Sequence, residues 1–219
     1  MGKMTIEQML IQLAGGMGTS IQIFLVTLIF SLPLGLLVAF GRMSGNRVLQ
    51  AIVKVYISIM RGTPLMLQLM VVYFGPYYLF RIKVGSGYRL WATFIGFVIN
   101  YAAYFAEIYR SGIQSMPVGQ YEAARILGYS RFQTFFKIIL PQVIKRILPS
   151  VTNEVITLVK DTSLARIISV YELTFTGYSF MKSSGLVWPF FYTGVFYLLF
   201  VGILTILFNL IERKLSYFR

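Results

Sequence analysis

Long hydrophobic stretches without a charged residue recur along this chain, separated by polar connections. An apolar stretch of about 17–25 residues is long enough to cross the hydrocarbon core of a bilayer as a helix. Four stretches fit this description: Thr19–Phe40, Thr63–Phe80, Leu90–Ala106 and Leu186–Ile211. A fifth, Ile147–Tyr171, mixes apolar runs with charged residues, which predicts a span that lines a polar interior. The pattern therefore predicts an all-α membrane protein with five transmembrane helices.

The distribution of positive charge predicts how the chain is oriented. Cytoplasmic connections of membrane proteins collect Lys and Arg. Most of the 20 Lys and Arg residues fall on the inside if the N-terminus lies outside and the C-terminus inside. Residues 1–18 are then expected to form an interfacial helix ended by Gly15-Gly16, residues 19–214 the transmembrane domain, and residues 215–219 a short tail.

Composition agrees with a bilayer environment and excludes several kinds of site. The 219 residues are 57% hydrophobic and only 12% charged, which is too apolar for a soluble domain of this length. The absence of Cys and His excludes disulfides, Cys/His zinc sites and Ser-His catalysis. Asp161 is the only aspartate, so one chain cannot build a two-aspartate protease. The net charge of +13 fits positively charged membrane flanks, so we expect neither an enzyme nor a nucleic-acid-binding protein.

A polar, charged segment follows the third predicted span. A short helix is predicted over Gln120–Leu127, and Gly128 can end it in the left-handed conformation. Ser130 and Gln133 have the spacing of a capping box. They predict the start of a second helix, which is expected to run to Leu140-Pro141.

Two interpretations of this segment stay open on the residues alone. Ala123 and Ala124 leave one helix face nearly flat, so another protein surface could approach its backbone. Glu122 and Arg125, spaced i, i+3, would lie at the edge of that face. In the alternative, the segment only connects two spans along the membrane surface, with aromatic residues such as Phe132 among the lipid headgroups.

The same segment resembles a known family. The sequence EAA at 122–124, Gly128, and Ile138-x-Leu140-Pro141 match, in residue type and spacing, the EAA loop of ABC importer permeases. Three stretches are similar to the polar amino-acid branch of that family: RGTPLMLQL at 61–69, AYFAEIYRSGIQSMPVGQYEAARILG at 103–128, and NEVITLVKDTSL at 153–164. The resemblance covers about residues 19–214.

The resemblance implies a fold, a location and a set of partners. It implies the type I ABC importer permease fold, in a multi-pass subunit of a prokaryotic inner membrane. Two permease subunits would pair, as a homodimer or a heterodimer, over a cytoplasmic ABC ATPase dimer, and an extracytoplasmic binding protein would deliver an amino acid. ATP and Mg²⁺ would be bound by the ATPase, in agreement with the lack of a G-x-x-x-x-G-K-[ST] motif here. No cofactor or metal of the chain's own is expected.

The resemblance also implies a role for the polar segment, as a coupling loop at about residues 115–141. In the family, each permease inserts its EAA helix into a groove on the ATPase, so that ATP-driven closure switches the pore between inward-facing and outward-facing states. The coupling residues carried over to this chain are Glu122, Ala123, Ala124, Arg125 and Gly128.

Charged residues inside a span are costly and usually functional. Glu154, Thr157 and Asp161 share one helical stripe, and Asn153 and Lys160 lie on an adjacent one. The carboxylates could hold a substrate ammonium or guanidinium, and the lysine an α-carboxylate. Alternatively, Asp161 caps the next helix and Glu154 pairs with a basic group. The predicted substrate path comprises Asn100, Asn153, Glu154, Thr157, Lys160, Asp161 and Ser163.

Three further polar features of the sequence lead to structural predictions. Arg61-Gly62-Thr63-Pro64 breaks the helix that enters the second span, as a hinge, a pore lining or a simple bend. Asn100 faces either the path or the partner subunit. Glu107 and Arg110, spaced i, i+3, are expected to form an interfacial ion pair.

Together these features predict the permease subunit of an ATP-driven importer of polar amino acids that works by alternating access. Two carboxylates and one lysine on the predicted path favour a basic amino acid. Two alternatives remain. One is a secondary transporter driven by an ion gradient, with Glu154 or Asp161 as the ion site. The other is a membrane anchor or assembly scaffold.

Overall fold

The computed structural model describes residues 6–85 and 87–215, whose regular structure is entirely helical. The elements in chain order are α1 (Ile6–Arg42), α2 (Arg47–Gly62), α3 (Leu65–Phe80), α4 (Tyr88–Gln114), α5 (Val118–Ile126), α6 (Arg131–Gln133), the π-helical segment η1 (Thr134–Ile139), α7 (Leu140–Asp161), the 3-10 segment η2 (Thr162–Ile168), α8 (Leu173–Ser184) and α9 (Trp188–Leu215). The all-α class is thereby confirmed for these residues. Residues 1–5 of the predicted interfacial helix and residues 216–219 of the predicted tail lie outside the described part.

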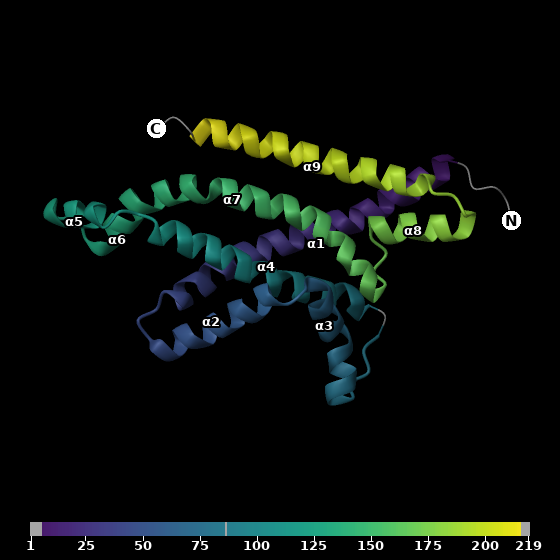
Figure 1. The fold of residues 1–219 in the computed structure, drawn as a ribbon, viewed down its shortest axis with the longest axis horizontal. Helices are drawn as coiled ribbons and strands as arrows, with labels where there is room; N and C mark the ends of the chain where they lie inside the picture. Colours follow the sequence, from purple (N-terminus) through teal and green to yellow (C-terminus); the bar gives the residue numbers. More distant parts are fainter. Residues whose placement is uncertain (1–5, 86, 216–219) are drawn as a thin grey trace.

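The molecule is elongated, with the long helices running between two ends (Figure 1). The short helices α5 and α6 lie at one end, and α8 and the start of α1 lie at the other. Helix α9 ends toward the α5 end, opposite to the start of α1, and α3 diverges from the bundle. The start of the first long helix and the end of the last one are therefore on opposite sides of the molecule.

Helices α1 and α4 form the centre of the fold through close backbone contact. A Cβ added at Gly35 on α1 would lie 2.9 Å from Phe105 Cβ and 3.1 Å from the Ala102 carbonyl oxygen. Phe97, Tyr101 and Phe105 of α4 are fully buried. Helices in lipid gain little from the hydrophobic effect between them and associate by such close packing, which small residues permit.

Helix length and apolar composition identify the membrane-crossing candidates among the described residues. Helices α1, α4 and α9 qualify, and the pair α2 and α3 adds a fourth crossing if it counts as one broken span. The two helices of that pair meet at 108°, which confirms the break predicted at Arg61–Pro64. The predicted fifth span falls on α7 and η2 and stays a prediction, because α7 carries several charged residues.

An amide network holds the break between α2 and α3. The Gln68 side-chain nitrogen donates to the Met60 carbonyl oxygen (3.0 Å) and to the Thr63 carbonyl and hydroxyl oxygens (3.1 and 2.8 Å). The Asn100 side-chain nitrogen donates to the same Met60 carbonyl (3.1 Å) and to Gln68 Oε1 (3.0 Å). These amides satisfy backbone carbonyls that the end of α2 leaves without helical partners, so the bend is a fixed feature of the fold.

The predicted end of the first helix at Gly15-Gly16 is wrong, because α1 continues without interruption from Ile6 to Arg42. Gly16 is buried, and a Cβ there would meet Thr176 Oγ1 at 2.7 Å and Leu173 Cα at 3.1 Å. The glycine therefore serves close packing against the start of α8 and does not terminate a helix. At Gly15 a Cβ would meet nothing within 4 Å.

Two predicted boundaries around α7 are also wrong. The second helix of the polar segment does not end at Pro141, because the helical path continues from η1 into α7. Pro141 lies in the first turn of α7, where the missing N–H costs little, and the π-helical η1 precedes it. The predicted helix over Ile147–Tyr171 stops at Asp161, where η2 begins, and Ser169 then turns the chain with a left-handed φ of 59°.

Candidate functional site

The polar segment forms a small, well-capped unit at one end of the molecule (Figure 1). Helix α5 ends at Ile126, and Gly128, two residues later, has a φ of 78°, which confirms the predicted left-handed position. Ser130 Oγ accepts from the Gln133 amide (3.2 Å), and Gln133 Oε1 accepts from the Ser130 amide (2.9 Å), which confirms the capping box. The turn between α5 and the following helix therefore has a defined geometry.

The predicted coupling residues divide into exposed and buried members. Glu122, Ala123, Arg125 and Gly128 are exposed, whereas Ala124 is only 1% exposed. The prediction that both alanines form a flat outer face is therefore wrong for Ala124. One residue along a helix rotates the side chain by about 100°, which turns Ala124 inward while Ala123 stays at the surface.

Large apolar side chains are prominent on the outer surface of this segment, and of these the sequence analysis singled out only Phe132. Ile126 is 87% exposed, Leu127 73%, Val118 70% and Phe132 69%. Large exposed apolar groups that lie together mark a surface for a protein or a membrane. Of these residues, Ile126 lies about 200° around α5 from the inward-facing Ala124, so its position on the outer side could be read from the sequence.

The predicted substrate-path residues of α7 and η2 share one open face. Asn153, Thr157 and Lys160 are exposed, and Glu154 and Asp161 are half-buried. Ser163 follows in η2, also half-buried. The opposite side of α7 packs into the core through Val155, Leu158 and Val159, which are 0–1% exposed. The face is therefore polar along its length and at least partly open in this chain.

Asp161 has a partner that the sequence analysis did not find. The Tyr101 hydroxyl donates to Asp161 Oδ2 at 2.7 Å, and the buried Tyr101 ring stacks on Phe97 at 6.3 Å. Asp161 makes no side-chain capping bond to η2, which decides against one predicted alternative. A tyrosine buried in an apolar helix needs a partner for its hydroxyl, and this requirement is the signal that would have found the contact.

One predicted alternative paired Glu154 with a basic group, and another prediction placed Asn100 on the substrate path or at the partner subunit. Glu154 makes no salt bridge to the described Lys and Arg residues. Asn100 is 4% exposed and bonded to Met60 and Gln68 at the break, away from the α7 face. Its place in the substrate path stays a prediction, and its observed partners give it a structural role.

Glu172 is a buried carboxylate that the sequence analysis missed. It is 0% exposed, and its oxygens accept from the Thr174 and Phe175 amides, both at 2.7 Å, and from the Tyr197 hydroxyl at 3.3 Å. It therefore caps the N-terminus of α8. Glu172 lies outside the crossing helices, and burial raises its pKa to about 7 although these hydrogen bonds oppose the shift.

The described residues bring together no group of three or more Asp, Glu, His or Cys side chains that could hold a metal ion. The chemistry that the arrangement offers is electrostatic and hydrogen-bonding: carboxylates, one ammonium and amides on an open helix face.

Known proteins resemble this chain over most of its length. The family model described as "Binding-protein-dependent transport system inner membrane component" matches residues 31–217. The arginine transport system permease protein ArtQ of Bacillus subtilis is 34% identical over 208 residues, covering 92% of this chain and 91% of that protein. The L-cystine transport system permease protein TcyB of the same organism is 39% identical over 161 residues, covering 74% of this chain and 67% of that protein.

A solved structure agrees with this similarity. It is described as an amino acid ABC transporter with histidines, and its chain superposes with a TM-score of 0.86 at 28% identity. The match covers 97% of this chain and 100% of that chain.

Proposed function

This chain belongs to the family of binding-protein-dependent transport system inner membrane components, and we propose that it is the permease subunit of an ATP-driven importer of polar amino acids. Membership confirms the resemblance predicted from the EAA segment, and relatives of the chain are amino-acid ABC transporter permeases. The observation that carries the proposal is the EAA segment itself. It forms an exposed helix at one end of a molecule whose long helices run toward the other (Figure 1).

The connection between α5 and α7 suggests how a partner's movement reaches the substrate path. The Ser130–Gln133 capping box starts a helical path that continues through α6 and η1 into α7 without a loop. The polar face with Glu154 and Asp161 lies on that same α7. A displacement of α5 by an ATPase would therefore move the polar face, which would expose it alternately to the two sides of the membrane.

The proposed assembly places two permeases over an ABC ATPase dimer, with ATP and Mg²⁺ held by the ATPase. An extracytoplasmic binding protein would deliver the substrate to the other end of the permease pair. Five crossings, with the N-terminus outside and the C-terminus inside a prokaryotic inner membrane, are supported by the opposite placement of the start of α1 and the end of α9. Purification of the complex from native membranes would show whether the two permeases are identical chains.

We propose a basic amino acid as the substrate class. Glu154 and Asp161 lie on one face of α7, and no salt bridge among the described residues brings a positive charge to Glu154. A guanidinium or ammonium group would supply that charge, and Lys160 would face the α-carboxylate. One relative is named for arginine and another for L-cystine, so the family accommodates more than one substrate.

The proposed function is tested by uptake of labelled amino acids into proteoliposomes that contain the co-purified complex. We expect uptake that requires ATP and survives an ionophore. Glu122→Ala should lower uptake by at least about tenfold, because a charged contact to the ATPase is lost. Glu7→Ala, an exposed change on α1, is the matched control.

Two outcomes would reject this assignment, and a third would change only its substrate class. Uptake that continues without ATP and collapses with the ionophore would establish a secondary transporter. Full uptake in Glu122→Ala would support a connection or scaffold role for the segment. Uptake of glutamate but not arginine would overturn only the proposed substrate class.

A further inference from the structure

A second polar site lies on the α1–α2–α4 side of the molecule, and none of the residues that line it belongs to α7. A cavity of about 190 Å³ is lined by Arg42, Lys54, Ile57, Ser58, Arg61 and Glu107. Arg42 is the last residue of α1, the next four lie on α2, and Glu107 lies on α4. The site is therefore formed by three different helices.

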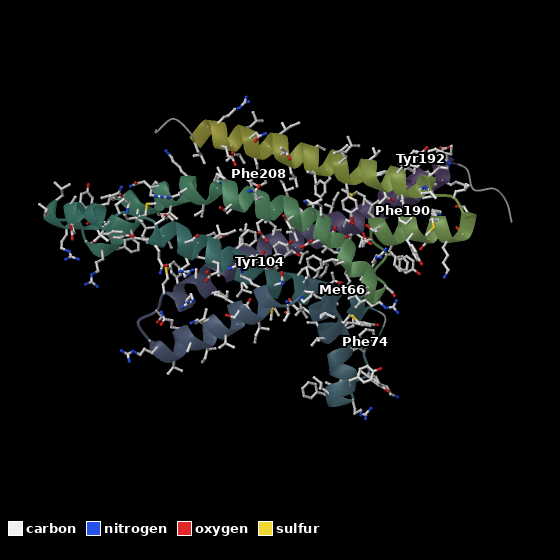
Figure 2. The ribbon with its side chains drawn as sticks, viewed as in Figure 1. Met66, Phe74, Tyr104, Phe190, Tyr192 and Phe208 are labelled. Atoms are coloured by element: carbon white, nitrogen blue, oxygen red, sulfur yellow. The ribbon has the colours of Figure 1, made fainter. Side chains whose placement is uncertain are left out.

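Positive charge is in excess in this cavity. Glu107 is its only carboxylate, and it already accepts from Arg110 Nη2 (2.6 Å) and Nε (3.0 Å), in the ion pair that the sequence predicted. Arg61 reaches Glu107 only at 3.9 Å and lies 5.3 Å from the centre of the Tyr104 ring, which projects from α4 toward α2 (Figure 2). Neither Arg42 nor Lys54 forms a salt bridge with a described residue.

The surface beside the cavity indicates which kind of anion would bind. Lys54, Ser58 and Arg61 form one stripe along α2, spaced i, i+4, i+7. A second stripe of the same helix, about 120° further around it, is apolar and exposed. Its members are Val48 (68%), Ile52 (62%), Val55 (58%) and Ile59 (51%). A soluble phosphate would use the cationic stripe alone, whereas a phospholipid would use both.

We propose that this cavity binds the headgroup phosphate of an anionic phospholipid, with Arg42, Lys54 and Arg61 as its partners and the acyl chains along the apolar stripe of α2. Basic pockets between transmembrane helices on the cytoplasmic side bind such headgroups. A second copy of this chain is a poorer occupant, because its own net charge is +13. The site depends on the orientation expected from the Lys and Arg distribution, and it does not depend on the transported substrate.

The test measures lipid retention in the intact complex. The complex is placed in phosphatidylcholine nanodiscs that contain phosphatidylglycerol, released, and analysed by native mass spectrometry for bound phosphatidylglycerol. We expect retained phosphatidylglycerol in the natural protein. Loss of two cations in the double variant Arg42→Gln/Lys54→Gln should weaken retention by about thirtyfold. Arg61 stays unchanged because it also contacts Glu107 and Tyr104.

Two matched variants keep the result interpretable. Lys182→Gln/Lys214→Gln removes the same charge at exposed positions on α8 and α9, outside the lining of the cavity, and should retain the lipid. Arg42→Lys/Lys54→Arg keeps the charge and should also retain it, which separates a folding defect from a lost site.

Other outcomes overturn the proposal. Equal retention in Arg42→Gln/Lys54→Gln and in the natural protein would show that the lipid binds elsewhere. Displacement of the lipid by inorganic phosphate alone would assign the cavity to a soluble anion. Dissociation of the permease pair in Arg42→Gln/Lys54→Gln, but not in Arg42→Lys/Lys54→Arg, would assign it to the subunit interface.

Discussion

Three carboxylates of this apolar chain are each held in place by an identified partner. Asp161 is held by the Tyr101 hydroxyl, Glu107 by Arg110, and Glu172 by two backbone amides. Glu154 differs from these three carboxylates, because it has neither a salt bridge nor a side-chain hydrogen bond within the described residues, and it lies on the open face of α7. A carboxylate without a partner in a membrane protein is costly, which supports a role in binding.

Loss of the Asp161 charge should weaken transport of a basic amino acid. Asp161→Asn keeps the size of the side chain and removes the charge, so arginine uptake should fall by about tenfold or more. Tyr101→Phe removes only the hydrogen bond that orients the carboxylate and should cause a smaller loss. Concentration-dependent uptake into proteoliposomes measures both variants. Unchanged arginine uptake in Asp161→Asn would remove this residue from the proposed path.

Glu172 should make stability depend on pH. Its pKa is raised from 4.5 to about 7 in the fold, so the native carboxyl keeps a proton that the unfolded chain has released. The contribution of this group to stability is thus present below about pH 4.5 and is lost as pH rises toward about 7. Thermal unfolding of the purified complex should show a higher midpoint at about pH 5 than at about pH 8.

The neutral variant Glu172→Gln supplies the control for this pH dependence. It retains an oxygen that can accept from one of the two capping amides, but it does not titrate. The difference between the two midpoints should shrink in this variant. A difference of the same size in both proteins would show that other groups cause it.

At the scale of the elements, small residues decide which helices approach one another. Gly16 allows α1 to touch the start of α8, and Gly35 allows it to touch α4. Both glycines lie inside one long helix, where glycine is otherwise unfavourable by about 1 kcal/mol relative to alanine. At these two positions the close approach of the neighbouring helix offsets the loss in helix propensity.

Adjacent glycines of α1 give a direct test of this packing. Gly16→Ala would place a Cβ 3.1 Å from Leu173 Cα, a backbone atom that cannot rotate away, and should destabilise the protein by about 1–3 kcal/mol. Gly15→Ala meets no atom within 4 Å and should be neutral or stabilising by up to about 1 kcal/mol. Unfolding midpoints of the two variants check the prediction, and equal midpoints would contradict it.

The sequence was informative where local chemistry determines structure. The long apolar helices, the break at Pro64, the left-handed Gly128 and the Ser130 capping box follow from residue type and spacing alone. The continuity of α1 through Gly16 could not be predicted in this way, because the reason for that glycine lies on α8. The inward position of Ala124 and the bond between Tyr101 and Asp161 also depend on tertiary contacts.

At the scale of the whole molecule, the two ends have different surfaces. The α5 end presents exposed apolar residues such as Ile126 and Leu127 beside the charged Glu122 and Arg125. The opposite end contains α8 and the start of α1 (Figure 1). A permease that contacts a cytoplasmic ATPase and an external binding protein needs two such distinct ends, with a rigid connection between them.

Site-specific cross-linking can show which end meets the ATPase. The chain has no cysteine, so a single introduced cysteine carries a photoactivatable maleimide at one known place. Ala123→Cys is exposed and should capture a nucleotide-hydrolysing subunit in the intact complex, whereas Ala124→Cys, at a position 1% exposed, should resist labelling until the protein is denatured. Ser184→Cys, exposed at the end of α8, should capture no ATPase. Capture from Ser184→Cys but not from Ala123→Cys would reverse the proposed orientation, and capture from neither would reject the coupling role of α5.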